Sequence, residues 1–287
     1  MGHLVRTVAI TGASRGLGEA LAALYASPGR TLGLLGRDRE RLEAVAARCR
    51  DRQARVVIGT PDVTDGAALA RWLESFDAVH PIDLLIVNAG IFTGHGKAAP
   101  ETVDEATGVL RTNLEGAVLT IAAVLPMMRA RRSGRIAIVA SLAALHPLAD
   151  APAYSASKAG LIAYGEALRE WLAPDNVAVT LICPGHIKTS QVAHHVGALP
   201  LIVSAETAAR IIKRGLDRGQ ASIVFPQRLL WLIRAGRLVP WRLRALLGAG
   251  ARFHVAKPMS APGDIPATHS GFRAAAEGPD DTRGKSR

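Results

Sequence analysis

The chain has 287 residues, a length that fits one large α/β domain followed by a C-terminal appendage. Apolar residues make up 49% of it, yet no uninterrupted run of about 18 or more marks a transmembrane helix. The net charge of +11 would suit nucleic acid, but residues 226–287 hold eleven Lys and Arg against four Asp and Glu. Because most of the excess charge lies in the appendage, we expect no nucleic-acid partner.

The N-terminal segment enters a strand-like pattern at once, without the charged start, apolar stretch and small-residue cleavage site of a signal peptide. Cys49 and Cys183 are isolated and lack the spacing of a metal or redox motif, which favours reduced thiols. We therefore expect a cytoplasmic protein without a metal site.

Short apolar segments rich in β-branched residues alternate with helical patterns. Strands are predicted at RTVAIT, TLGLLG, ARVVIG, DLLIVN, RIAIVA, VAVTLIC and ASIVF, and helices at 17–26, 39–50, 66–78, 103–132, 154–172 and 205–218. Strands that are apolar on both faces, each followed by a helix, predict a parallel sheet covered on both sides. The fold class is therefore α/β, a Rossmann-type doubly wound sheet of about seven strands in a single domain, with ligands beyond the carboxyl ends of the strands.

A glycine-rich turn, TGASRGLG at residues 11–18, joins the first strand to the first helix. Glycines let backbone amides approach a pyrophosphate closely, and the helix N-terminus adds free N–H groups and partial positive charge. Glycines also serve ordinary tight turns, but this position between strand and helix favours dinucleotide binding.

The stretch AYSASKAG places Tyr154 four residues before Lys158 at the start of a predicted helix. Residues at i and i+4 share a helix face. A positive charge beside a phenol, whose ordinary pKa is about 10, favours the phenolate. The pair could thus act as a general acid and base. The alternative is a half-buried tyrosine beside a solvated lysine.

The TGxxxGxG spacing, the triplet Asn88-Ala89-Gly90 and the pair Tyr154-x-x-x-Lys158 together resemble the short-chain dehydrogenase/reductase family. The resemblance covers residues 4–225 and predicts that 1–225 form a dinucleotide-binding catalytic domain. It extends to Asp62 after the third strand, Asn113 in RTNLEG, Ser141 thirteen residues before Tyr154, and Pro184-Gly185 with Ile187 and Thr189.

This resemblance implies a role for each catalytic candidate. Tyr154 would give a proton to a carbonyl oxygen, or remove a hydroxyl proton in reverse, and Ser141 would hydrogen-bond the same oxygen. Lys158 would lower the pKa of Tyr154 and hold the nicotinamide ribose, while Asn113 would anchor a water that connects Lys158 to solvent. Alternatively, Ser141 caps a strand end, Asn113 is a helix N-cap and Thr189 starts a helix.

The same resemblance implies a longer set of cofactor-binding residues. They are Gly12, Ser14, Arg15, Gly16, Leu17, Gly18, Arg37, Asp62, Val63, Asn88, Ala89, Gly90, Tyr154, Lys158, Pro184, Gly185, Ile187 and Thr189.

Two arginines predict which nicotinamide cofactor is preferred. An acidic residue at the end of the second strand would bind the adenosine ribose of NAD, whereas an arginine accommodates the 2′-phosphate of NADP. Here Arg37 takes that place and Arg15 adds a second guanidinium, so we favour NADP(H). NAD(H) stays an alternative, because Asp38 would reach the ribose if the strand ended one residue later.

Residues 226–255 form a basic, apolar extension, predicted to be helical, and residues 256–287 have the composition of a disordered tail. The part at 227–248 contains Trp231, Trp241 and five arginines but no acid. Such helices suit an anionic membrane surface. The alternatives are a lid over the substrate pocket or a subunit interface.

The sequence therefore predicts an NADP(H)-dependent oxidoreductase that interconverts a ketone or aldehyde and an alcohol. The flanking segments 142–152 and 186–204 are largely apolar, which favours a hydrophobic or lipid-like substrate. We expect a homodimer or homotetramer, cytoplasmic or at the membrane surface. A non-catalytic dinucleotide-binding sensor and a sugar-modifying member of the same family are the alternatives.

Overall fold

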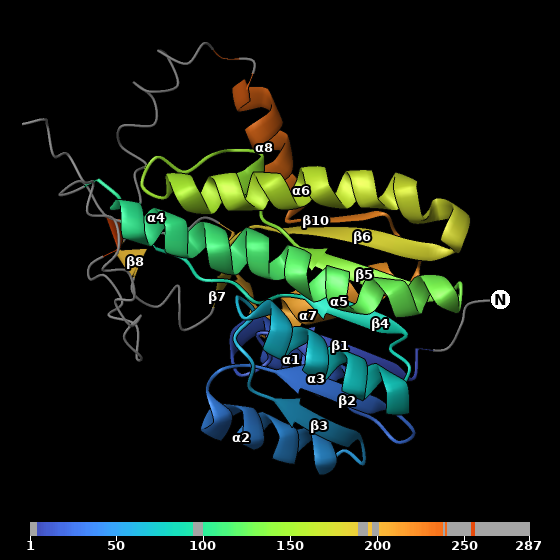
Figure 1. The fold of residues 1–287 in the computed structure, drawn as a ribbon. Coiled ribbons are helices and arrows are strands. Elements are labelled where there is room, and N and C mark those ends of the chain that lie inside the picture. Colours follow the sequence, from blue (N-terminus) through green and yellow to red (C-terminus); the bar gives the residue numbers. More distant parts are fainter. Residues whose placement is uncertain are drawn as a thin grey trace, which may run out of the picture.

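A seven-stranded parallel sheet forms the centre of the computed structural model (Figure 1), which describes residues 5–93, 100–188, 195–196, 201–237, 239 and 254–255. Its strands are β1 (Thr7–Thr11), β2 (Thr31–Leu35), β3 (Arg55–Gly59), β4 (Leu84–Val87), β5 (Gly134–Val139), β6 (Val177–Pro184) and β10 (Ser222–Phe225). They lie in the order β10-β6-β5-β4-β1-β2-β3 and all pair in parallel. The predicted doubly wound sheet is confirmed.

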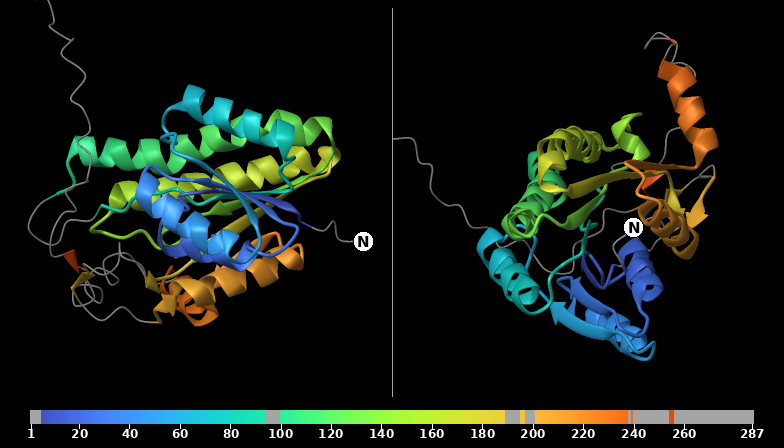
Figure 2. Two further views of the ribbon diagram at one scale, coloured as in Figure 1. Left: turned by 90° about the horizontal axis from the view of Figure 1, so that it is seen from below. Right: turned by 90° about the vertical axis from the view of Figure 1, so that its right-hand side faces the viewer.

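Helices cover both faces of this sheet (Figure 2). One face carries α1 (Gly16–Tyr25), α2 (Arg39–Arg50) and α7 (Ala205–Asp217), and the other carries α3 (Gly66–Val79), α4 (Val103–Leu110), α5 (Gly116–Ala130) and α6 (Pro152–Leu172). Along β1, Val8 and Ile10 point into the first core and Ala9 into the second. Both faces of the strands are therefore buried, as their apolar sequences predict.

The remaining elements are short or lie at the end of the chain. They are the π-helical η1 (Arg111–Glu115), the 3-10 turns η2 (Leu142–Ala144) and η3 (Ala173–Asp175), β7 (Ile187–Lys188), β8 (His195–Val196), β9 (Val203–Ser204), α8 (Gln227–Arg237) and β11 (His254–Val255). β7 pairs with β9 and β8 with β11. The predicted tail at 256–287 and most of the 238–255 part of the extension lie outside the described residues.

One long helix runs through α4, η1 and α5, over Val103–Ala130, and matches the single helical pattern predicted for 103–132. It is long and apolar enough to cross a membrane, and 50% of its most apolar window is buried. Because α4 packs against α6 and α5 against α3 and the sheet, this is a core helix of the domain.

The chain changes direction between β1 and β4, and this positions the site. From β1 it winds outward through β2 to β3, then returns to β4 on the other side of β1 and winds outward to β10. Loops that leave adjacent strands in opposite directions open a crevice at their carboxyl ends. The loops after β1 and β4 therefore flank the place where a ligand binds.

Candidate active site

The turn between β1 and α1 requires glycine at three positions. Gly12 and Gly16 have φ of +67° and +61°, a backbone region that side chains disfavour. A Cβ on Gly18 would collide with the carbonyl oxygen of Gly12 and lie 2.7 Å from Asn88 Nδ2. The Arg15 side chain makes no capping hydrogen bond to α1. The N–H groups of the first turn of α1 are thus presented at the crevice.

Thr11 and Asn88 tie the two crevice loops together. Thr11 Oγ1 accepts hydrogen bonds from the backbone N–H groups of Asn88 and Ala89, at 3.0 and 3.1 Å. Asn88 Nδ2 in turn donates to the carbonyl oxygens of Thr11 and Gly12, at 3.0 and 3.2 Å. The glycine turn and the Asn88-Ala89-Gly90 triplet, 76 residues apart in sequence, therefore form one rigid unit.

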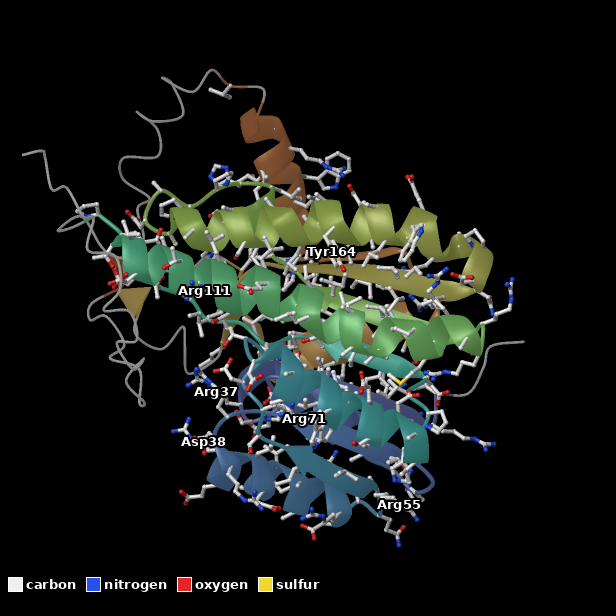
Figure 3. All side chains as sticks on the ribbon, viewed as in Figure 1. Arg37, Asp38, Arg55, Arg71, Arg111 and Tyr164 are labelled. Carbon is white, nitrogen blue, oxygen red and sulfur yellow. The ribbon has the colours of Figure 1, made fainter. Side chains whose placement is uncertain are left out.

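Three arginines gather at the carboxyl end of β2, where Figure 3 shows Arg37 beside Asp38. Desolvation, followed by the charges of Arg41 and Arg37, lowers the pKa of Arg15. Asp38 is the N-cap of α2: Oδ1 accepts from the Arg41 backbone N–H at 3.0 Å, and Oδ2 lies 3.1 Å from Arg41 Nε. The sequence did not single out Arg41.

Asp62 lies on the other side of Arg37. Its Oδ2 accepts a hydrogen bond from Arg37 at 3.3 Å, and its Oδ1 accepts from the backbone N–H and hydroxyl of Thr64 at 2.9 and 2.8 Å. Desolvation opposes ionisation, but the Thr64 and Arg37 contacts outweigh it and lower the pKa of Asp62. A carboxylate at this point holds Arg37 at the crevice.

The other predicted cofactor residues surround the same crevice, apart from Thr189, which lies outside the described residues. Ser14 packs against Gly36, Leu17 is part of the core beneath α1, Val63 contacts Gly116 at the start of α5, and Pro184 and Ile187 belong to β6 and β7.

Ser141, Tyr154 and Lys158 meet at the carboxyl ends of β5 and β6. Ser141 Oγ accepts from the Ala143 backbone N–H at 3.1 Å, so this residue does cap η2, and it also hydrogen-bonds Tyr154. Lys158 Nζ lies 5.7 Å from the centre of the Tyr154 ring and donates to the Val139 carbonyl oxygen at 2.9 Å. The tyrosine and lysine share one face of α6, as their spacing predicts.

Burial dominates the electrostatics of this group. Desolvation raises the pKa of Tyr154, while the hydrogen bond from Ser141 opposes the rise. Desolvation also lowers the pKa of Lys158 to about 8, against a small opposing effect of the Cys183 thiol. The sequence predicted that Lys158 lowers the pKa of Tyr154, and that stays a prediction; desolvation is the largest effect on this phenol in the structure, and it raises the pKa.

Asn113 is fully buried in the π-helical turn η1, inside a continuous helix, so the N-cap alternative is wrong. Its Oδ1 accepts from the Ile91 backbone N–H at 2.7 Å, and its Nδ2 donates to the Ile91 carbonyl oxygen at 2.9 Å and to Ser157 Oγ at 3.2 Å. Ser157 donates to the Tyr154 carbonyl oxygen at 2.7 Å. Asn113 thus connects the loop after β4 to α6 through Ser157, which the sequence did not single out.

Apolar side chains lie next to the catalytic candidates. Phe92 meets the Tyr154 ring edge to face, with 4.8 Å between ring centres. A Cβ on Gly185 would lie 3.2 Å from Leu229 of α8 and 3.4 Å from Leu142 of η2. The start of α8 therefore packs beside the loop after β6 and beside Leu142, the residue that follows Ser141.

Comparison with known proteins gives this arrangement a family. A sequence model described as short chain dehydrogenase matches residues 6–197. The chain belongs to the short-chain dehydrogenase family.

Relatives of this dehydrogenase match most of its length. An uncharacterized oxidoreductase of Myxococcus xanthus is 34% identical over 249 residues, which cover 86% of this chain and 96% of that protein. The 11-beta-hydroxysteroid dehydrogenase-like 2 protein of Arabidopsis thaliana is 31% identical over 252 residues, which cover 82% of this chain and 78% of that protein. A solved short-chain dehydrogenase from Sphingobium yanoikuyae in complex with NADPH superposes with a TM-score of 0.71 at 28% identity. The superposition covers 86% of this chain and 94% of the solved one.

The dehydrogenase is therefore an NAD(P)-dependent oxidoreductase, and its residues fit that cofactor. Gly12 and Gly18 let the turn pack closely against the loop after β4, and the α1 N-terminus and Arg15 provide donors and positive charge. In the part of the chain that the structure describes, no group of three or more His, Cys, Asp or Glu side chains could hold a metal ion.

The glycine turn yields a direct prediction. Gly18→Ala forces a methyl group into the Gly12 carbonyl and the Asn88 amide, so we expect the affinity for NADPH to fall tenfold or more, measured by nucleotide fluorescence titration. The matched control is Gly108→Ala in α4, where a Cβ meets nothing within 4 Å and alanine favours the helix. Equal affinities in the two variants would contradict the close approach inferred for this turn.

Proposed function

We propose that this dehydrogenase is an NADP(H)-dependent carbonyl reductase, or alcohol dehydrogenase in the reverse direction, acting on a hydrophobic ketone. The observation that carries the proposal is the convergence of the Tyr154 phenol, the Ser141 hydroxyl and the buried Lys158 ammonium beside a dinucleotide crevice. A passive nucleotide sensor has no need for a proton donor and an oxyanion donor at one point.

The nicotinamide cofactor supplies the hydride, and the chain supplies protons and placement. Tyr154 keeps its proton at neutral pH because its pKa is raised, so it serves as the general acid toward a carbonyl oxygen. Ser141 donates a hydrogen bond to the same oxygen as negative charge develops there. Lys158, positive below about pH 8, stabilises the tyrosinate left behind and holds the nicotinamide ribose.

The arginine cluster supports NADP(H) over NAD(H). Arg15, Arg37 and Arg41 offer three guanidinium groups for a 2′-phosphate, which arginines bind with bidentate geometry. Asp38, the residue that would favour NAD(H), is engaged through both oxygens with Arg41 at the start of α2. A carboxylate so engaged is a poor acceptor for ribose hydroxyls.

The apolar side chains support the substrate class. Phe92 packs on Tyr154, and Leu142 and Leu229 lie beside Gly185 close to Ser141; burying apolar substrate surface against such side chains contributes about 25 cal/mol per Å². The resemblance to a hydroxysteroid dehydrogenase-like protein also favours a bulky apolar carbonyl compound.

Replacing the phenol tests the proton step. Tyr154→Phe keeps the ring and its contact with Phe92 but removes the acidic proton. We expect turnover of a hydrophobic ketone to fall by at least about 100-fold, the usual scale of general acid catalysis. Affinity for NADPH should stay within a few-fold, as followed by nucleotide fluorescence. Turnover equal to the unmodified enzyme would remove Tyr154 from the mechanism.

The pKa of Lys158 sets a pH dependence for cofactor binding. Because burial lowers this pKa to about 8, the ammonium is present below that pH and is lost as the pH rises through it. We expect the affinity of the free enzyme for NADPH to fall across this range, as measured by titrations from about pH 7 to pH 9.5. The Lys158→Met variant should bind NADPH weakly, with an affinity that does not change over the same pH range. A flat profile in the unmodified enzyme would contradict a role for the lysine charge in binding.

Charge reversal tests the cofactor preference. Arg37→Asp replaces attraction with repulsion at the 2′-phosphate alone, so the kcat/KM for NADPH should fall by about 100-fold or more while that for NADH changes little. Arg39→Asp, on the exposed first turn of α2, makes the same change in net charge and should have a small effect. An unmodified enzyme that uses NADH better than NADPH would overturn the assignment.

A further inference from the structure

The outward face of α8 exposes apolar side chains between basic ones. Trp231 is 64% exposed and Leu232 74% exposed, and Arg228 and Arg234 are exposed beside them. The Arg234 guanidinium lies 5.4 Å from the Trp231 ring centre. The helix contains no Asp or Glu, and it projects away from the layered domain beyond α6 (Figures 1 and 2).

The inward face of the same helix borders the active site. Leu230 is only 5% exposed, and Leu229 reaches Gly185 and the region of Leu142. Among the alternatives for this segment, the sequence left a membrane contact and a pocket lid open. On α8 they occupy opposite faces, so one helix can serve both.

We propose that the outward face of α8, formed by Arg228, Trp231, Leu232 and Arg234, docks this dehydrogenase on an anionic lipid bilayer. Indole and leucine side chains insert at the boundary of headgroups and acyl chains, while arginines stay at the phosphate level. The inference rests on the proposed function, because a hydrophobic ketone dissolves in lipid and α8 would place the approach to Tyr154 next to that source.

Charge favours a bilayer over a second copy of the chain. In a two-fold contact through this face, the arginines of both copies would be brought together, and α8 offers no carboxylate to pair with them. An anionic lipid surface attracts every one of them.

Vesicle co-sedimentation tests the docking with the full-length chain. We expect binding to vesicles of phosphatidylcholine containing one third phosphatidylglycerol, much weaker binding to pure phosphatidylcholine, and partial loss as salt rises above about 0.1 M. The double variant Trp231→Ser/Leu232→Ser should bind about tenfold more weakly. The matched control is Trp171→Ser in α6, since Trp171 is also exposed and also has an arginine over its ring, and it should bind as the unmodified chain does.

Activity on a water-soluble ketone with NADPH separates this inference from the proposed function. The double variant should keep that activity, because its changes lie on the outward face. No vesicle binding by the unmodified chain, or equal loss in the Trp171 control, overturns the docking while leaving the reaction intact. The face belongs to a subunit contact instead if two results coincide. The unmodified chain does not bind vesicles, and the double variant has a different oligomeric state in analytical ultracentrifugation. If neither the unmodified enzyme nor any variant reduces the ketone, the proposed function is overturned instead.

Discussion

The site depends on one buried amide. Chains that leave a parallel sheet carry backbone N–H and C=O groups that no neighbouring strand can satisfy, and each costs free energy if it is buried without a partner. Asn113, fully buried, satisfies both groups of Ile91 and then reaches Ser157, which holds the Tyr154 carbonyl oxygen. One side chain therefore fixes the loop after β4 and the start of α6 relative to each other, and with them the positions of Phe92, Tyr154 and Lys158.

The sequence predicted the fold because its signals are local. Apolar strands alternating with helical patterns indicate a doubly wound parallel sheet, and the sheet confirms it. The order of the strands and the return from β3 to β4 could not be read from such patterns, because they depend on packing between segments far apart in the chain. The π-helical turn at 111–115 was also hidden, since its sequence continues the helical periodicity of the segments on either side.

Spacing located the candidate site residues better than it predicted their partners. Tyr154 and Lys158 share a helix face because four residues make one turn, which is a local rule. Arg41 and Ser157 were missed because their relevance comes from other side chains, Asp38 and Arg15 for the first and Asn113 for the second. The motif also did not reveal the effect of burial, which raises the pKa of Tyr154, because burial cannot be judged from spacing alone.

In the proposed reaction, burial of Lys158 would couple cofactor binding to proton transfer. An ammonium held against a neutral carbonyl oxygen carries a desolvation cost, which is what lowers its pKa to about 8. Any development of negative charge on the neighbouring phenol relieves that cost, since the two groups attract more strongly where water is excluded. In the proposed reaction the lysine would therefore do little for Tyr154 in its protonated form but would stabilise the tyrosinate, and a differential interaction of this kind lowers the barrier to a proton step. Burial alone holds the proton on Tyr154, so in the proposed reaction the buried ammonium is the charge that would offset this effect when a carbonyl oxygen takes the proton up.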